Sequence, residues 1–112
     1  MTIFSKILSG QIPCTKVFED EHVLAFDDVT PQAPVHVLII PKVAFANLNE
    51  ATPAQQAVLG HMLVVAKQVA ELKGVSASGY RVVFNTGADA GQSVLHIHAH
   101  VLGGRPLAWP PG

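Results

Sequence analysis

The sequence has little charge. Asp, Glu, Lys and Arg make up 13% of its 112 residues, about half of the roughly 25% found in an ordinary soluble domain. Seven Lys and Arg residues oppose eight Asp and Glu residues, so the net charge at pH 7 is −1. Because no cluster of basic residues is present, we expect no binding to the phosphate backbone of nucleic acids.

Cysteine and long apolar runs are also scarce. Cys14 is the single cysteine, so an internal disulfide is excluded and a reducing cytoplasm is the expected location. No uninterrupted apolar run approaches the roughly 20 residues of a membrane-spanning helix. The N-terminal segment becomes polar too early for a signal peptide. We therefore expect a cytoplasmic protein with no membrane partner.

Apolar residues and histidine are what the chain has in excess. Apolar residues make up 49% of the sequence, and six residues are histidine. The length and the apolar content predict a single domain over residues 1–112 and exclude intrinsic disorder. With so few charges to cover its surface, part of the apolar excess is expected to lie against another chain, which favours a homodimer.

Turn-forming residues divide the chain into short elements. Thr52 followed by Pro53 is typical of a helix start, and Gly74 of a helix end. The expected helices cover residues 3–8 and 53 to about 73, the expected strands cover 17–19, 23–27, 35–40, 80–85 and about 95–102, and residues 103–112 are expected to form an extended tail. This order predicts an α+β fold with a five-stranded antiparallel sheet, one long helix and one short helix.

The long helix has an unusually wide apolar stripe. Apolar residues recur at helical spacing from Leu59 to Ala70, and Val58, Val65 and Leu72 widen the stripe. A helix that packs on a single sheet is polar over a broader arc. The pattern therefore predicts a second apolar neighbour, which again favours a dimer interface.

Three histidines alternate near the C-terminus. Residues 96–102 read His-Ile-His-Ala-His-Val-Leu. Alternate side chains of a strand share one face, so His96, His98 and His100 are expected to project together, with the intervening apolar residues directed towards the core.

Two chemistries suit such a face, and the first is a metal site. Imidazole is the commonest transition-metal ligand. However, His96 and His100 would have Cα atoms about 13 Å apart in a strand, which is wide for one tetrahedral ion. A third ligand, such as His36, would have to come from elsewhere. The sequence has no Cys-x-x-Cys or His-Glu-x-x-His motif, and we expect no metal or other cofactor.

The second chemistry is covalent catalysis by histidine. Imidazole has an unperturbed pKa of about 6.5, so its neutral form is available to attack an electrophilic phosphorus. Gly91, Gln92 and Ser93, together with Asn85, offer neutral donors for a phosphoryl group. Neither a Gly-x-Gly-x-x-Gly nor a P-loop motif is present.

The histidine segment resembles the signature of the histidine triad (HIT) superfamily, and other segments resemble its histidine triad nucleotide-binding (Hint) branch. Those segments are Ile3-Phe4-Ser5-Lys6-Ile7, Ile12-Pro13, Pro31-Gln32-Ala33-Pro34-Val35-His36, Ile40-Pro41-Lys42, Gly91-Gln92-Ser93, Gly103-Gly104-Arg105 and Trp109-Pro110-Pro111-Gly112. The resemblance covers nearly the whole chain. It implies a homodimer whose two five-stranded sheets join into one ten-stranded sheet.

The resemblance also implies an activity, that of a purine nucleoside phosphoramidase. His98 would attack the α-phosphorus of an adenosine or guanosine 5′-phosphoramidate and form a nucleotidyl-histidine intermediate. His36 and His96 would serve a relay that orients and deprotonates His98. His100, with Asn85, Gln92 and Ser93, would contact the phosphate and the leaving group.

The nucleoside contacts follow from the same resemblance. Asp28 matches a ribose-binding carboxylate, and Trp109 matches a tryptophan near the active site, often that of the partner subunit. The purine pocket would be formed by Ile3, Phe4, Ile7, Ile12 and Phe26. Two positions depart from the family pattern: Ala99 is smaller than usual, and Asp27 stands where histidine is frequent.

Other functions stay open at this stage. The polyphosphate branch of the superfamily hydrolyses dinucleoside polyphosphates, although the Trp-Pro-Pro-Gly tail and the Gln-Ala-Pro segment argue against it. A nucleotide-binding regulatory module with incidental catalysis, or a metal-binding protein that uses the histidine face, would be a different class. His22 and His61 lie outside every motif and are expected to be solvated.

Overall fold

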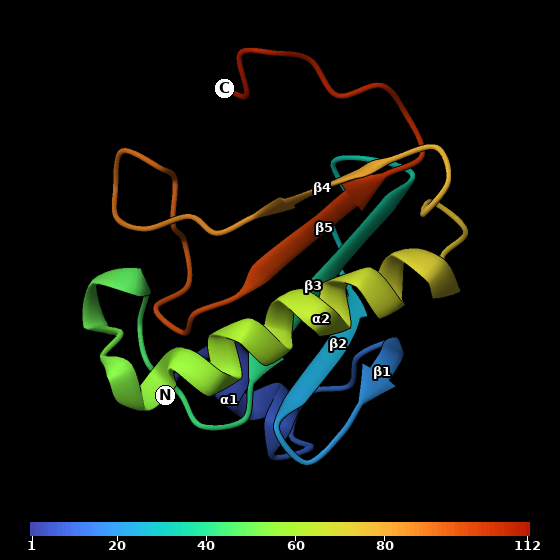
Figure 1. Ribbon diagram of the computed structural model, residues 1–112. Coiled ribbons are helices and arrows are strands. Elements are labelled where there is room, and N and C mark those ends of the chain that lie inside the picture. Colours follow the sequence, from blue (N-terminus) through green and yellow to red (C-terminus); the bar gives the residue numbers. More distant parts are fainter.

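An antiparallel sheet of five strands in the order β1-β2-β3-β5-β4 forms the centre of the protein (Figure 1). The computed structural model describes all residues, 1–112. The strands are β1 (Lys16–Glu19), β2 (Val23–Asp27), β3 (Val35–Pro41), β4 (Tyr80–Val83) and β5 (Ala99–Gly103), and the helices are α1 (Ile3–Leu8) and α2 (Gln56–Leu72), with 3₁₀ turns η1 (Leu48–Glu50) and η2 (Pro53–Gln55). The predicted α+β class is confirmed.

Local signals explain how α2 begins and ends. The Thr52 side chain accepts a hydrogen bond from the N–H of Ala54, and the Gln55 side chain accepts one from the N–H of Thr52. This capping box closes the first turn as the 3₁₀ turn η2, so the α-helix proper starts at Gln56 and not at Pro53. Gly74, with φ of +75°, follows the helix as predicted.

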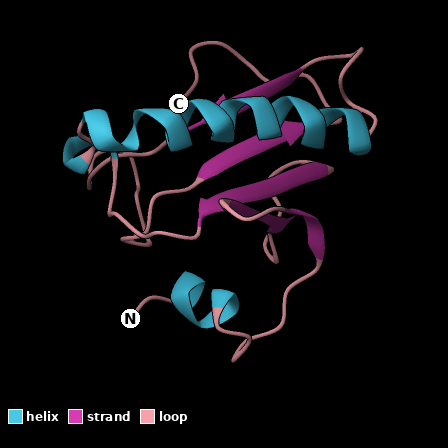
Figure 2. Cartoon of the chain, turned by 60° about the horizontal axis from the view of Figure 1, so that its bottom comes forward, coloured by secondary structure: helices cyan, strands magenta, loops and turns pink.

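The two faces of the sheet carry separate apolar clusters because strand side chains alternate. On one face, Val37 and Ile39 pack with Met62 and Val65 of α2. On the other face, Leu38 packs with residues of α1 and β2, including Phe4. Figure 2 shows α2 lying along one side of the sheet and α1 on the opposite side. We call these sides the α2 face and the α1 face.

The last strand starts later than predicted. The sequence suggested a strand from about residue 95, whereas β5 begins at Ala99, which pairs with Ile39 of β3. Continuing this register would place Ile97 opposite Pro41, which has no N–H to extend the ladder. Ile97 instead donates its N–H to the carbonyl of Phe45 at 2.7 Å. His96 and His98 therefore lie in an irregular segment just before the strand.

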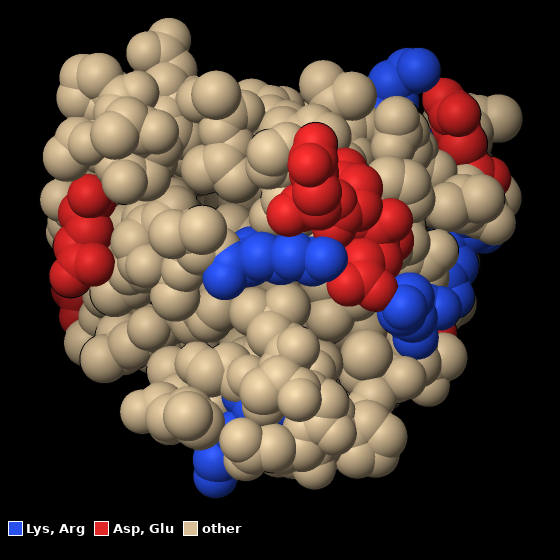
Figure 3. Space-filling view, turned by 90° about the horizontal axis from the view of Figure 1, so that it is seen from below, with Lys and Arg blue, Asp and Glu red and all other residues tan.

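The molecule keeps apolar side chains on its surface. On α2, Leu63 and Val64 are each 54% exposed and Leu72 is 64% exposed, so the wide apolar stripe extends beyond what the sheet covers. Figure 3, which views the molecule from below, shows small groups of charged side chains separated by broad uncharged surface. No helix is long and apolar enough to cross a membrane.

Candidate active site

A cavity of about 240 Å³ opens on the α1 face. Its apolar part is formed by α1 and the sheet, and its polar part by the ends of β2 and β5. The lining includes the predicted Ile3, Phe4, Ile7, Ile12, Phe26, Asp28, Ser93, His98 and His100. The structure thus brings together the expected purine pocket, the carboxylate and two of the triad histidines.

His98 presents a lone pair at this cavity. Its Nδ1 lies 2.8 Å from the backbone carbonyl of His96. A carbonyl can only accept, so Nδ1 carries the proton, and the neutral ring has a free lone pair on Nε2. The ring is 7% exposed and packs edge-on against Phe4, with centroids 5.0 Å apart. The hydrogen bond to the His96 carbonyl and the contact with Phe4 therefore hold the His98 ring in one orientation.

His96 lies beneath the cavity and does not line it. Its side chain is 1% exposed, and Nε2 donates to the carbonyl of Pro41 at 2.9 Å. Its Nδ1 has no hydrogen-bond partner. The His96 ring was expected to orient His98. In the structure it is instead the backbone carbonyl of His96 that orients the His98 ring, by accepting its Nδ1–H.

His36 and His100 form a direct pair. Their strands place them two residues out of register on the same face of the sheet, since His36 lies opposite Leu102 and His100 opposite Leu38. His36 accepts the N–H of Gln32 at Nδ1 (3.0 Å), so neutral His36 carries its proton on Nε2. That Nε2 lies 2.8 Å from Nδ1 of His100. Nδ1 of His100 is therefore the acceptor, and its Nε2 carries the proton. His36 thus contacts His100 and not His98.

The environment favours neutral imidazoles at pH 7. Burial lowers the pKa of His36, His96 and His98 below the ordinary value. For His100, burial and the adjacent rings of His98 and His36 lower the pKa to about 4. The Asp28 carboxylate, 3.4 Å from Nε2 of His36, opposes the lowering of the pKa of His36, His98 and His100 without reversing it.

Three groups of this site lie at metal-binding distances. Donor atoms of Asp28, His36 and His100 all lie within 4.8 Å of one another. Ligands of a tetrahedral zinc ion with Zn–N bonds of 2.0–2.1 Å stand about 3.3 Å apart. The 2.8 Å between the two imidazole nitrogens is shorter than this and suits a shared proton. As placed, the three groups fit a hydrogen-bonded network and not a zinc centre.

The loop after β4 is held by Gln92. Its Oε1 accepts from Asn47 and from the N–H of Gly87, and its Nε2 donates to the carbonyls of Ala46 and Val94. The side-chain amide of Gln92, which was predicted to bind phosphate, therefore makes its hydrogen bonds within the protein. Gly91, with φ of +79°, donates its N–H to Ala88 within the turn. The backbone N–H of Ser93, beside the cavity, donates to no protein acceptor.

Asn85 and Trp109 lie outside the cavity, as do His36, His96, Gly91 and Gln92. Asn85 follows the end of β4 by two residues and is half-buried, and Trp109 is 81% exposed. The tail that carries Trp109 is held to the sheet by Arg81, whose guanidinium donates to the carbonyls of Leu107 and Ala108. Within one chain, this tryptophan does not reach the site.

The cavity also includes residues that sequence reasoning missed. These are Pro13, Cys14, Asp27, Val29, Leu38 and Val94. Leu38 shares a face with His36 two residues away, so strand alternation offered a signal for it. Asp27, noted only as a departure, forms an ion pair with Lys73 at 2.8 Å.

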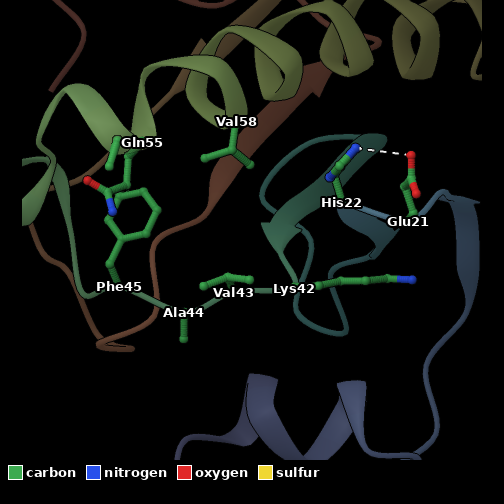
Figure 4. A pocket seen from close by; sticks show the side chains of 9 residues that line it. Glu21, His22, Lys42, Val43, Ala44, Phe45, Gln55 and Val58 are labelled. Carbon is green, nitrogen blue, oxygen red and sulfur yellow. Dashed lines mark ion pairs between the residues drawn. The ribbon is translucent and has the colours of Figure 1, made fainter.

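A second cavity of about 270 Å³ lies between the start of α2 and the segment after β3 (Figure 4). Its polar side chains already have partners: Nε2 of His22 lies 3.2 Å from the Glu21 carboxylate, and Lys42 forms an ion pair with Glu19 at 2.8 Å. His22 is exposed as expected, but nearby His61 is half-buried and bonded to Asp20 at 2.6 Å.

Comparison with known proteins identifies the family. The model of the HIT domain matches residues 9–107. An uncharacterized HIT-like protein of Synechococcus elongatus is 57% identical over 99% of this chain and 96% of its own length. A 14 kDa zinc-binding protein of Zea mays is 54% identical over 99% and 88%. The crystal structure of a HIT family hydrolase from Legionella pneumophila superposes with a TM-score of 0.97 at 49% identity, covering 100% of both chains.

Proposed function

The chain belongs to the HIT family, and from its site we propose that it is a hydrolase of purine nucleoside 5′-phosphoramidates. The observation that carries this proposal is the neutral Nε2 of His98, whose lone pair is left free by the Nδ1–H bond to the carbonyl of His96. It stands at the polar end of a cavity whose remaining walls are mainly apolar. Such a nitrogen is a nucleophile for phosphorus.

The reaction divides into two displacements. In the first, Nε2 of His98 forms a bond to the α-phosphorus, the P–N bond to the amine breaks, and the amine takes up one proton as it leaves. In the second, water attacks the same phosphorus, the bond to His98 breaks, and the proton is returned as the nucleoside monophosphate forms. The Nε2–H of His100 is the imidazole donor that lines the cavity beside His98, with ring centroids 4.9 Å apart.

The cavity suits a nucleoside monophosphoryl group. Its apolar walls offer contact area to a purine base. Phe4 belongs to these walls and also contacts the His98 ring edge-on. Asp28 stands between the apolar and polar parts as a candidate acceptor for ribose hydroxyls. Ser93 offers its hydroxyl and its free N–H to phosphoryl oxygens.

The charge of the lining favours a phosphoramidate over a dinucleoside polyphosphate. None of the 15 lining residues is Lys or Arg, and two are Asp. A phosphoramidate brings one negative charge to the site, whereas a polyphosphate brings several. Like charges repel more strongly in a partly buried cavity than in water. Neutral donors are adequate for the first substrate and poor for the second.

We further propose that the chain acts as a homodimer, in which two sheets join into one of ten strands. β4 is an edge strand of the sheet, and Leu63, Val64 and Leu72 of α2 are exposed. Together they provide a strand edge and an apolar helix face for a second copy. In such a dimer the exposed Trp109 would reach towards the partner's site. The single Cys14 supports a cytoplasmic location.

One set of assays tests the activity. The protein is incubated with adenosine 5′-phosphoramidate or with diadenosine polyphosphates, with and without EDTA, beside His98→Ala and the control His22→Ala. We expect rapid AMP release from the phosphoramidate, unaffected by EDTA and by His22→Ala, and abolished by His98→Ala. Faster turnover of the polyphosphates, full activity in His98→Ala, or loss of activity with EDTA would overturn the proposal.

A further inference from the structure

Gln32 donates its backbone N–H to Nδ1 of His36 from outside the cavity, at 3.0 Å. We propose that this single N–H, held in place by Arg105, fixes the tautomers of both His36 and His100. It thereby makes Nε2 of His100 a proton donor to the substrate. Gln32 and Arg105 are then positioning residues, and the inference rests on the proposed phosphoramidase activity for its catalytic consequence.

The number of ring protons limits which tautomers the two histidines can adopt. Neutral His36 and His100 have two ring protons for four ring nitrogens, and one proton must lie between the rings, which are joined at 2.8 Å. If Nδ1 of His36 carried a proton, it would face the Gln32 N–H, and two donors would meet without an acceptor. Leaving these two donors without an acceptor would cost free energy, above all at Nδ1 of the buried His36.

The opposite tautomer would reverse the chemistry at the cavity. His36 would then accept at Nε2, His100 would donate from Nδ1, and Nε2 of His100 would be a bare lone pair. The site would contain two acceptors, His98 and His100, and no imidazole donor for the leaving nitrogen. One backbone N–H thus decides whether His100 donates or accepts.

The segment that carries this N–H is held by the end of β5. The guanidinium of Arg105 donates to the carbonyl of Gln32 at 2.9 Å. Next to it, Gly104 has φ of +88° and lies so close to Pro34 that an added Cβ would stand 2.9 Å from the Cβ of that proline. β5 pairs with the start of β3 at Gly103 and Val35. β5, which ends two residues before Arg105, also carries His100, so both ends of the network are tied to one element.

The other end of the segment is held from β2. The Asp28 carboxylate, which directly follows β2, accepts the N–H of Thr30 at 2.8 Å. Asp28 also donates its own N–H to the carbonyl of His36 at 2.9 Å. The position of the Gln32 N–H is thus set from both flanks.

The test reads the tautomers directly. Nitrogen-15 NMR of the ring nitrogens in the protein without substrate distinguishes protonated from unprotonated Nδ1 and Nε2. We expect both His36 and His100 to carry their proton on Nε2. Gln32→Pro removes the N–H, and Gln32→Ala is the matched control that keeps it and loses only the side chain. Arg105→Ala releases the carbonyl of Gln32, and Arg105→Lys restores a donor.

The expected outcomes separate positioning from a structural role. Gln32→Pro should populate the Nδ1–H tautomer of His36 and lower kcat about tenfold, part of the 10²–10⁴-fold contribution of general acid–base catalysis, with KM nearly unchanged. Arg105→Ala should shift the tautomers in the same direction to a smaller extent, with rescue by Arg105→Lys and no change in Gln32→Ala.

Three results would overturn the proposal. These are a native His36 tautomer in Gln32→Pro, a shifted tautomer with unchanged kcat, or, if Gln32→Pro does not fold, native tautomers and kcat in a folded Arg105→Ala. Failure of the proposed function gives a different pattern. The wild-type protein would then show the expected tautomers but no release of AMP from the phosphoramidate.

Discussion

Nε2 of His36 lies 2.8 Å from Nδ1 of His100, so two residues 64 positions apart in the sequence share one proton. The contact arises because β3 and β5 are neighbours, with His100 opposite Leu38. The pair resists the uptake of a further proton, since both ring nitrogens of His36 already take part in hydrogen bonds. Both the activity and the free energy of unfolding should therefore depend on pH.

The rate should remain high at acid pH values where free histidine is already protonated. Burial lowers the pKa of His98, and burial with neighbouring rings lowers that of His100 to about 4. The neutral nucleophile therefore persists below the ordinary value of about 6.5. We expect kcat/KM for adenosine 5′-phosphoramidate, corrected for spontaneous hydrolysis, to be level from pH 8 to pH 6.5 and to fall only at lower pH. A midpoint at or above 6.5 would contradict the lowered values.

The same shifts predict a loss of stability in acid. The pKa values of the buried histidines are lowered in the folded protein, so between about pH 6.5 and 4 the unfolded chain binds protons that the folded chain does not. The free energy of unfolding is then unaffected above pH 6.5 and falls as the pH drops through this window. Urea unfolding at pH 7.5 and 5.5 measures the loss, which we expect to be roughly 1–3 kcal/mol.

Two variants assign this loss to the buried site. His100→Asn removes a histidine of lowered pKa and should reduce the difference between the two pH values. The exposed His22 has no place in the buried network, so His22→Asn should leave the difference unchanged. If the wild type, His100→Asn and His22→Asn all lost the same free energy of unfolding between the two pH values, the loss would not come from the buried histidines.

Gln92 should matter for the loop beside the cavity and not as a direct phosphate ligand. Its side-chain amide makes four hydrogen bonds, which join the segment after β3 to the loop before β5. Gln92→Ala leaves several of these partners unpaired and should destabilise the protein by about 1–3 kcal/mol. Urea unfolding measures this effect, with Gln68→Ala on the exposed side of α2 as the control. Unchanged stability with a raised KM would instead indicate a direct contact with substrate.

Much of the fold could be predicted because its signals are local. Thr52 and Gly74 mark the limits of the long helical region, and alternation separates Val37 and Ile39 from Leu38. The start of β5 could not be predicted in this way. It depends on Pro41, which lies opposite the extension of that strand only after β3 and β5 have paired.

The same limit applies to the site. The alternation of the three histidines predicted a common face, and His98 and His100 do line one cavity. His96 does not, because its ring bonds to the carbonyl of Pro41. The tautomers depend on backbone groups of Gln32 and His96, which carry no mark in the sequence. Residue types indicated the kind of chemistry to expect, and tertiary contacts determine which ring nitrogens carry protons.

The apolar face of α2 and the free edge of β4 predict that two copies of the chain associate. Leu63 and Val64 are each 54% exposed on α2, and the sheet ends at β4 without a further strand. Burial of apolar surface against a second copy would stabilise the dimer by about 25 cal/mol per Å².

We expect sedimentation to give about 24 kDa, twice the chain mass of 11.9 kDa. Leu63→Glu should shift the protein to the monomer, since a buried unpaired charge is costly, whereas Gln11→Glu in the exposed turn after α1 should not. A wild-type protein of about 12 kDa at all concentrations, or a Leu63→Glu variant that sediments as the wild type, would contradict the proposed interface.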